Sequence, residues 1–85
     1  MQTIMTDKEE IDLARENIAT NVRDLMSARA MTQQELADEA DISQGFVSKI
    51  LRGTLLPNGL LLLKIARALG TTSEKLLDIP RRRAS

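Results

Sequence analysis

Apolar residues recur along the chain with the three- and four-residue spacing of an α-helix, and no segment alternates as a half-buried β-strand does. The longest pattern predicts a helix from about Asp7 to Ala30. Thr6 and Glu9 open it with the spacing of a capping box, in which two side chains satisfy free N–H groups at a helix start. Its predicted inward stripe comprises Ile11, Ala14, Ile18, Val22, Leu25 and Met26. The chain is therefore predicted to be all-α.

Four shorter helices are predicted next, each after a residue whose side chain can accept a hydrogen bond from helix N–H groups. They span about Gln33–Ala40 after Thr32, 44–52 after Ser43, 59–69 after Asn58 and 73–77 after Thr72. Glu35 completes a second capping box with Thr32. Their expected buried residues are Leu36, Ala37, Ala40, Val47, Ile50, Leu62, Ile65, Ala66 and Leu69, with Leu51 or Phe46 completing the third helix.

The two helices 33–40 and 44–52 are separated by a short turn at Asp41, a residue type that tolerates a left-handed backbone. A surface helix normally carries outward Glu and Lys, but the first turns of 44–52 carry small and amide side chains. A helix that enters the major groove of DNA needs such side chains near the bases and no carboxylate near a phosphate. This pair is therefore predicted to be a helix-turn-helix unit that binds double-stranded DNA through helix 44–52.

The charges of the chain are strongly segregated although their formal sum is zero. Residues 1–42 carry four Lys or Arg and ten Asp or Glu, whereas residues 43–85 carry eight Lys or Arg and two Asp or Glu. No acidic residue occurs between Asp41 and Glu74. A neutral protein with this distribution is expected to present a positive face, which favours binding to a polyanion.

The composition argues against several other classes of protein. Its 85 residues suggest one domain, and the absence of His and Cys removes the usual general base and the strongest nucleophile. No phosphate-binding loop and no apolar run long enough for a membrane span is present. Asp38, Glu39 and Asp41 are interpreted as a solvated helix end instead of a metal site. We expect a cytoplasmic protein that is not an enzyme and needs no cofactor.

The segment NVRDLMSARAMTQQELADEADISQGFVSKILRG, followed by PNGLLLLKIARALGTTSEKLL, resembles the phage-repressor and Cro-like (XRE) helix-turn-helix family. The resemblance runs from about Ile18 to Leu77. It implies a compact five-helix, lambda-repressor-like domain that binds operator DNA as a dimer and regulates transcription, in a bacterial or phage-encoded protein at the nucleoid. The expected organisation is an acidic extension of the first helix at 1–17, the DNA-binding domain at 18–78 and a basic tail at 79–85.

The resemblance also implies roles for individual residues. Gln33 resembles a residue that contacts phosphate and supports the next amide, and Gln44 resembles the leading base reader. An amide side chain can bind adenine through both N6 and N7. Outside this pattern, Gln44 would be read as an ordinary surface amide. The other expected DNA contacts are Ser43, Gly45, Phe46, Ser48, Lys49, Arg52 and Asn58, although packing in the core is the favoured role for Phe46.

Three features depart from the family pattern. Asp41 occupies a turn position at which Gly is usual, and a strained turn is therefore expected. The loop after Gly53 contains Leu55 and Leu56 where polar or basic residues are usual, which puts phosphate contacts from this loop in doubt. The acidic residues 1–17 do not resemble an arm that embraces DNA.

The chain contains more leucines after Gly53 than one helix stripe can bury. Leu60, Leu61 and Leu63 are additional to the stripe of the fourth helix, and two more leucines lie in the preceding loop. Exposed apolar patches tend to be interfaces. The predicted homodimer interface comprises Leu55, Leu56, Leu60 and Leu61. The alternative is that two or three of these leucines complete the core.

Two other interpretations remain open. One is an antitoxin-type module that neutralises a partner protein through the acidic first helix and also regulates its own operon. The other is that these residues are the N-terminal part of a longer repressor, in which case the basic residues near the end begin a linker.

Overall fold

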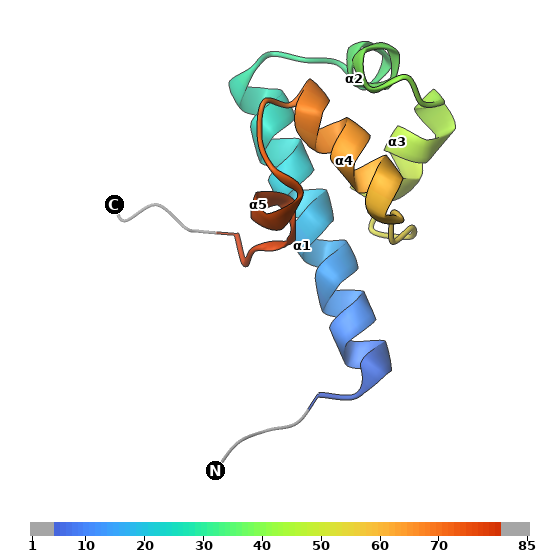
Figure 1. Cartoon of the computed structure of the whole chain (residues 1–85), viewed down its shortest axis with the longest axis vertical. Coiled ribbons are helices and arrows are strands. Elements are labelled where there is room, and N and C mark those ends of the chain that lie inside the picture. The colour runs from blue at the N-terminus through green and yellow to red at the C-terminus, as the bar shows by residue number, and fades with distance from the viewer. Residues whose placement is uncertain (1–4, 81–85) are drawn as a thin grey trace.

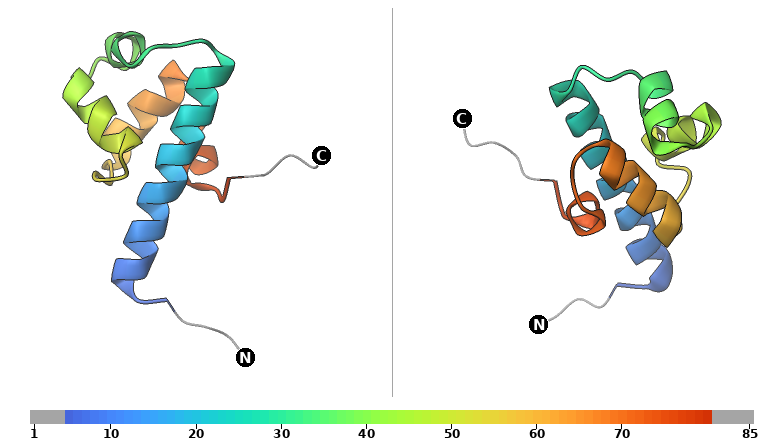
Figure 2. Two further views of the ribbon diagram at one scale, coloured as in Figure 1. Left: turned by 180° about the vertical axis from the view of Figure 1, so that it is seen from behind. Right: turned by 45° about the horizontal axis from the view of Figure 1, so that its top comes forward.

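One long helix, α1 (Asp7–Ala28), forms the axis around which four shorter helices are arranged (Figure 1). The computed structural model describes residues 5–80, and this part of the chain contains no β-strand. The shorter helices are α2 (Gln33–Ala40), α3 (Gln44–Leu51), α4 (Gly59–Ala68) and α5 (Ser73–Leu77). The views in Figures 1 and 2 place α3 and α5 on opposite sides of α1. The predicted all-α fold with five helices is confirmed.

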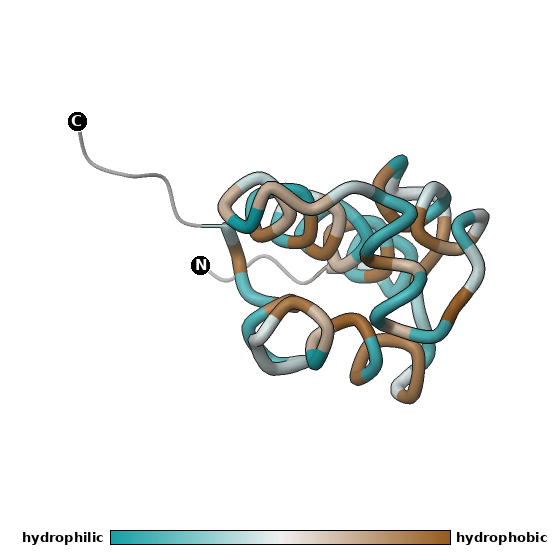
Figure 3. The backbone as a smooth tube through the Cα atoms, turned by 90° about the horizontal axis from the view of Figure 1, so that it is seen from above, coloured by the Kyte–Doolittle hydropathy of each residue, from teal (hydrophilic) through white to brown (hydrophobic). Residues whose placement is uncertain are grey.

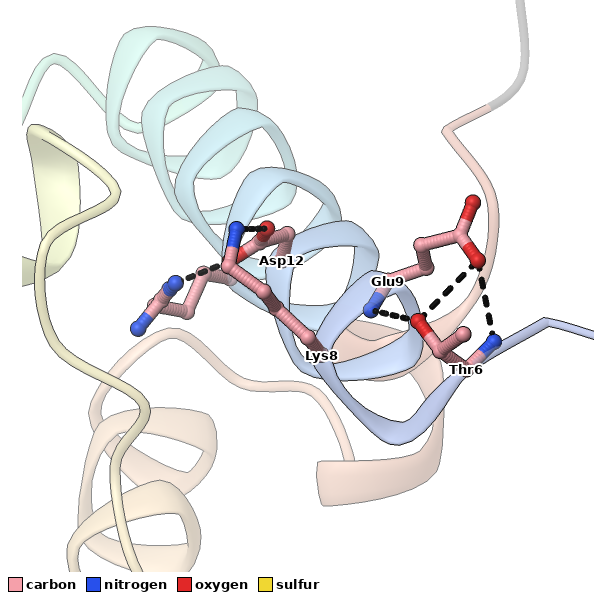
Figure 4. Close-up of polar contacts among 5 residues, drawn as sticks. Thr6, Lys8, Glu9 and Asp12 are labelled. Atoms are coloured by element: carbon pink, nitrogen blue, oxygen red, sulfur yellow. Dashed lines mark hydrogen bonds and ion pairs between the residues drawn. The ribbon is translucent and has the colours of Figure 1, made fainter.

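The predicted N-caps are all observed. Thr6 and Glu9 form a reciprocal capping box, in which the Glu9 N–H donates to Thr6 Oγ1 at 3.2 Å and the Thr6 N–H donates to Glu9 Oε1 at 3.0 Å (Figure 4). In the same acidic half of α1, Asp12 binds both Lys8 and Arg15. Thr32 forms the same box with Glu35, and Ser43, Asn58 and Thr72 cap α3, α4 and α5.

The predicted ends of three helices are slightly too late, whereas those at Ala40 and Leu77 are correct. The first helix ends at Ala28, two residues before the predicted end, because Arg29 caps it and Ala30 adopts a positive φ of 52°. This turn is made without glycine, so the sequence contains no obvious stop signal. The third and fourth helices each end one residue earlier than predicted, a difference within the usual uncertainty of helix boundaries.

The core lies between the C-terminal half of α1 and the other four helices. The helices are amphipathic, and hydrophobic and hydrophilic residues alternate around their turns (Figure 3). Ile11 was predicted to face inward but is 41% exposed, because the N-terminal part of α1 extends beyond its neighbours (Figure 1). The hydrophobic core cluster consists of Ile18, Val22, Met26, Leu36, Ala37, Val47, Ile50, Leu62, Ile65, Ala66, Leu69 and Leu76.

Polar side chains of α1 and of its C-cap residue bind carbonyl groups at the C-terminal ends of three other helices. Arg23 Nη2 donates to the Leu51 carbonyl at the end of α3, and Arg29 Nη1 donates to the Leu69 carbonyl at the end of α4, both at 2.6 Å. A Cβ added at Gly70 would lie 2.7 Å from this Arg29 nitrogen, so a side chain there would disrupt the contact.

Asn21 makes the third of these contacts. Its Nδ2 donates to the Leu76 and Asp78 carbonyls, each at 2.8 Å, and lies 3.3 Å from the Lys75 carbonyl. The amide group of one side chain therefore holds the end of α5 and the segment after it against α1.

We predict that Asn21→Ala lowers the free energy of unfolding by about 1–2 kcal/mol, because at least two carbonyls lose their donor. Urea denaturation followed by circular dichroism measures this change. Asn21→Asp serves as the matched variant, since it keeps the shape of the side chain but removes the donor, and it should destabilise at least as strongly. Parental stability in both variants would show that the contact is energetically neutral.

Candidate nucleic-acid interface

The α2 and α3 helices form a helix-turn-helix unit around a left-handed residue. Asp41 has φ 57° and ψ 49°, which confirms the prediction for this turn. The Ile42 N–H donates to the Ala37 carbonyl at 3.0 Å and closes the end of α2. Ala37 is almost fully buried, and its small side chain fits the close packing of α2 and α3. Fully buried Leu36 on α2 and Val47 on α3 attach both helices to the core.

The exposed face of α3 is defined by its buried residues. Val47 and Ile50 are buried, and Leu51 is half-buried beside them. At 100° per residue, the opposite side of the helix presents four of the predicted DNA contacts. These are Gly45, Lys49 and Arg52, which are exposed, and Ser48, which is half-buried. Gln44 is exposed as the first residue of α3. The face contains no carboxylate.

Gly45 lies on this face without an internal reason for a glycine. Its φ is not positive, and an added Cβ would meet only Ser43 Oγ, at an ordinary contact distance of 3.7 Å. A glycine in a helix is about 1 kcal/mol less favourable than alanine. The fold would therefore accept a larger residue at this position. Because Gly45 has no side chain, another molecule can approach the helix backbone closely there.

Phe46 does not pack in the core, and the prediction that favoured core packing is wrong. The buried side of α3 is filled by Val47, Ile50 and Leu51, so Phe46 lies at the edge of the helix and is 44% exposed. The alternative left open by the sequence, Leu51 or Phe46, is resolved in favour of Leu51. Phe46 turns toward the loop that follows α3 and lines a groove there with Leu56.

The remaining predicted DNA contacts lie at the starts of three helices. Gln33 begins α2 and is exposed, but no hydrogen bond joins it to Gln44 in the described part of the chain. The expected support of one amide by the other is therefore not present within the protein. Ser43 Oγ accepts from the Phe46 N–H at 3.3 Å, and Asn58 Oδ1 accepts from the Leu61 N–H at 2.8 Å. Both side chains act as helix caps.

The groove beside Phe46 has a volume of about 530 Å³ and lies between the start of α3, the loop 52–58 and the start of α4. Of the four predicted interface leucines, Leu56 and Leu60 are exposed, at 39% and 63%. Leu55 and Leu61 also line the groove but pack partly against the core. Leu63, which was not among the four, is 37% exposed. The extra leucines therefore divide between the core and the surface.

Sequence reasoning missed Arg23, whose contact with the Leu51 carbonyl fixes the end of α3 to α1. The two residues are 28 positions apart, and no local pattern connects them. A basic residue beside a helix C-terminus is electrostatically favourable, but the sequence does not show which helix end it will meet.

Comparison with known proteins agrees with this geometry. A helix-turn-helix family model matches residues 22–76. The chain belongs to the XRE-type helix-turn-helix family of DNA-binding transcription regulators. The N-terminal part of α1, from Asp7 to Asn21, lies before the matched region.

The fold is also similar to the crystal structure of the restriction-modification controller protein C.AhdI from Aeromonas hydrophila. The TM-score is 0.68 and the sequence identity 26%, and the match covers 76% of this chain and 96% of that chain. No curated protein gives a significant match. No helix within residues 5–80 is long and apolar enough to cross a membrane.

We predict that acid weakens the capping box at the start of α2. Hydrogen bonds from the Thr32 N–H and hydroxyl hold the pKa of Glu35 below its ordinary value of 4.5. A depressed pKa in the folded state means that this stabilisation is present above pH 4.5 and is lost as the pH falls through the folded pKa. On acidification, the melting temperature of Glu35→Gln should therefore fall less than that of the parent.

The control for this experiment is Glu39→Gln, which removes an exposed carboxylate elsewhere on α2. Melting curves from circular dichroism at several pH values compare the three proteins. Identical acid sensitivity of Glu35→Gln and the parent would contradict the assigned role of this carboxylate.

Proposed function

We propose that this protein is a sequence-specific repressor-type regulator that binds a two-fold operator as a dimer, with α3 in the major groove. The observation that carries the proposal is the exposed surface of α3, which combines an amide at its start with small and basic side chains and lacks any carboxylate. The major groove admits one helix, and these side chains can approach base edges without repelling phosphates.

Within this arrangement Gln44 reads an adenine through a pair of hydrogen bonds. Gly45 lets the helix backbone approach the bases, which explains a glycine that the fold itself does not require. Ser48 and Lys49 lie beside them, and Lys49 reaches either a guanine or a phosphate. Arg52 follows the last residue of α3 and binds phosphate, which positions the helix without reading sequence.

Gln33, Ser43 and Asn58 contribute through their places at helix starts. The N-terminus of a helix carries a partial positive charge and favours a phosphate. Three such starts border the DNA-binding unit, at α2, α3 and α4. We assign Phe46 to the neighbouring apolar surface instead of the DNA face, because it lies at the edge of α3 and faces the loop 52–58.

The apolar side chains beside α3 support a dimer. Phe46, Leu56, Leu60 and Leu63, here called the leucine surface, are each more than a third exposed. Contiguous exposed apolar patches commonly mark interfaces. Pairing this surface with its two-fold copy brings together two α3 helices, which can then read half-sites separated by about 34 Å along the DNA. Leu55 and Leu61 lie next to this surface and pack partly against the core.

A second candidate function is that of an antitoxin-type protein, whose first helix binds a partner. The observation in its favour is that the N-terminal part of α1 lies before the family match and extends beyond the other helices (Figure 1). Ile11 and Leu13 are exposed there, at 41% and 38%. The likeness to a restriction-modification controller supports the regulator, and a toxin-like reading frame beside the gene would support the alternative.

We predict that Gln44→Ala weakens specific binding by about 1–3 kcal/mol and relaxes the preference at one base pair. Arg52→Ala should weaken binding to all sequences alike and reduce the salt slope by about one. Fluorescence anisotropy on an operator selected from random DNA, and on single-base variants of it, measures both effects.

Gln34→Ala is the matched control, because Gln34 is an exposed amide that binds Asp38 within α2 and does not lie on α3. It should retain parental affinity. If Gln44→Ala kept both the affinity and the base preference of the parent, α3 would not be the helix that reads DNA.

We further predict that Leu60→Glu raises the dimer dissociation constant at least roughly a hundredfold, because a buried leucine contributes about 1.5–3 kcal/mol and occurs twice in a two-fold interface. Leu56→Glu should act in the same direction. Sedimentation equilibrium decides the oligomeric state. The control Ile79→Glu changes an apolar residue that is 75% exposed but lies outside the leucine surface. An unchanged dimer in both leucine variants would place the interface elsewhere.

A further inference from the structure

Two residues of opposite charge line the groove beside the leucine surface. Asp41 lies in the turn between α2 and α3, and Lys64 lies on α4. The other lining residues are apolar or uncharged. No ion pair joins Asp41 to Lys64 in the part of the chain that the structure describes, where the ion pairs present are those of Asp12 with Lys8 and Arg15. Each charge is therefore available to a molecule that enters the groove.

Asp41 occupies its position at a cost to the backbone. A left-handed φ of 57° is strained for a residue with a side chain, and glycine would adopt it freely. The Asp41 carboxylate makes no hydrogen bond to another described residue that would offset this strain. The Asp41 carboxylate also lies two residues before Ser43 and three before Gln44, close to the start of α3, where a negative charge does not favour phosphate. The Asp41 carboxylate is therefore free to bind a basic group of another molecule.

We propose that the groove is filled by a second copy of this chain, with Asp41 of each protomer paired to Lys64 of its partner. The proposal rests on the proposed dimer and adds the contacts that set its register. In a two-fold interface, a contact of residue i with residue j is always accompanied by the contact of j with i. One acidic and one basic residue on the same surface therefore produce two ion pairs at once.

The shape and chemistry of the surface favour a second copy over a small apolar ligand. Leu60 is 63% exposed at the edge of a groove that other leucines line. The exposed Leu60 side chain of one copy can therefore pack into the apolar groove of a second copy. An apolar ligand would cover the leucines but leave both charges without counter-charges, which is unfavourable when they are removed from water. The partner of matching charge and shape is the chain itself.

Two charge reversals test the pairing. Asp41→Lys and Lys64→Asp each turn two attractive contacts into two repulsive ones, so each variant alone should dimerise about tenfold more weakly than the parent, or weaker still. In an equimolar mixture the heterodimer regains both attractive pairs, and it should form with parental affinity. Sedimentation equilibrium, with one variant carrying a fluorescent label, measures the three affinities. The double variant Asp41→Lys/Lys64→Asp should also dimerise as the parent does.

Three controls separate charge from backbone strain. Asp41→Gly relieves the left-handed conformation, so it should raise the melting temperature of the fold while weakening the dimer. Asp38→Lys reverses an exposed acid of α2 that does not line the groove, and it should leave dimerisation unchanged. At about 1 M salt, where the screening length is about 3 Å, the differences among the variants should nearly vanish.

The possible failures are distinguishable. If Asp41→Lys and Lys64→Asp dimerise as the parent does, or if their mixture gains nothing, the ion pairs are wrong, and the leucine surface is still tested by Leu60→Glu. If the parent is a monomer at all concentrations, the proposed dimer fails together with this inference. A parent that is monomeric but binds an apolar dye in the groove, with loss of binding in Leu56→Glu, would identify the groove as a ligand site and overturn the proposal.

Discussion

The fold depends on contacts in which α1 satisfies the carbonyl groups at the ends of three other helices. The last carbonyls of a helix have no partner within it, and a buried end without one is unfavourable. Arg23 donates a hydrogen bond to the end of α3, Arg29 to the end of α4 and Asn21 to the end of α5. Because Asn21 and Arg23 belong to α1 and Arg29 is its C-cap, their spacing along one helix fixes the positions of three helix ends relative to each other. The orientation of α3 is therefore set partly from α1, outside the helix-turn-helix unit.

Most of the fold could be predicted because its determinants are local. The caps at Thr6, Thr32 and Ser43 depend on residues three positions apart, and the helical stripes depend on residues three or four apart. The errors have equally physical causes. Ala30 ends a turn in a left-handed conformation without glycine, and Ile11 continues a stripe beyond the point where other helices can cover it.

The candidate site was predictable where it follows from helical periodicity. Once Val47 and Ile50 are taken as buried, the face of α3 that carries Gly45 and Lys49 must point outward. The placement of Phe46 was not predictable in this way, because four apolar residues compete for a buried side that accommodates only Val47, Ile50 and Leu51. The groove and the contact of Arg23 depend on elements far apart in the sequence, and they appear only when the helices are assembled.

The projecting half of α1 has a consequence for the approach to DNA. The segment from Asp7 to Glu16 carries five acidic and two basic residues. The basic residues on or next to α3 and α4 are Lys49, Arg52, Lys64 and Arg67. The projecting half of α1 thus carries a net negative charge away from these basic residues, which contributes to an electric dipole. In the field of a polyanion such a molecule experiences a torque before it experiences a net attraction. The acidic end turns away from the duplex, and collisions are biased toward those in which the basic helices arrive first.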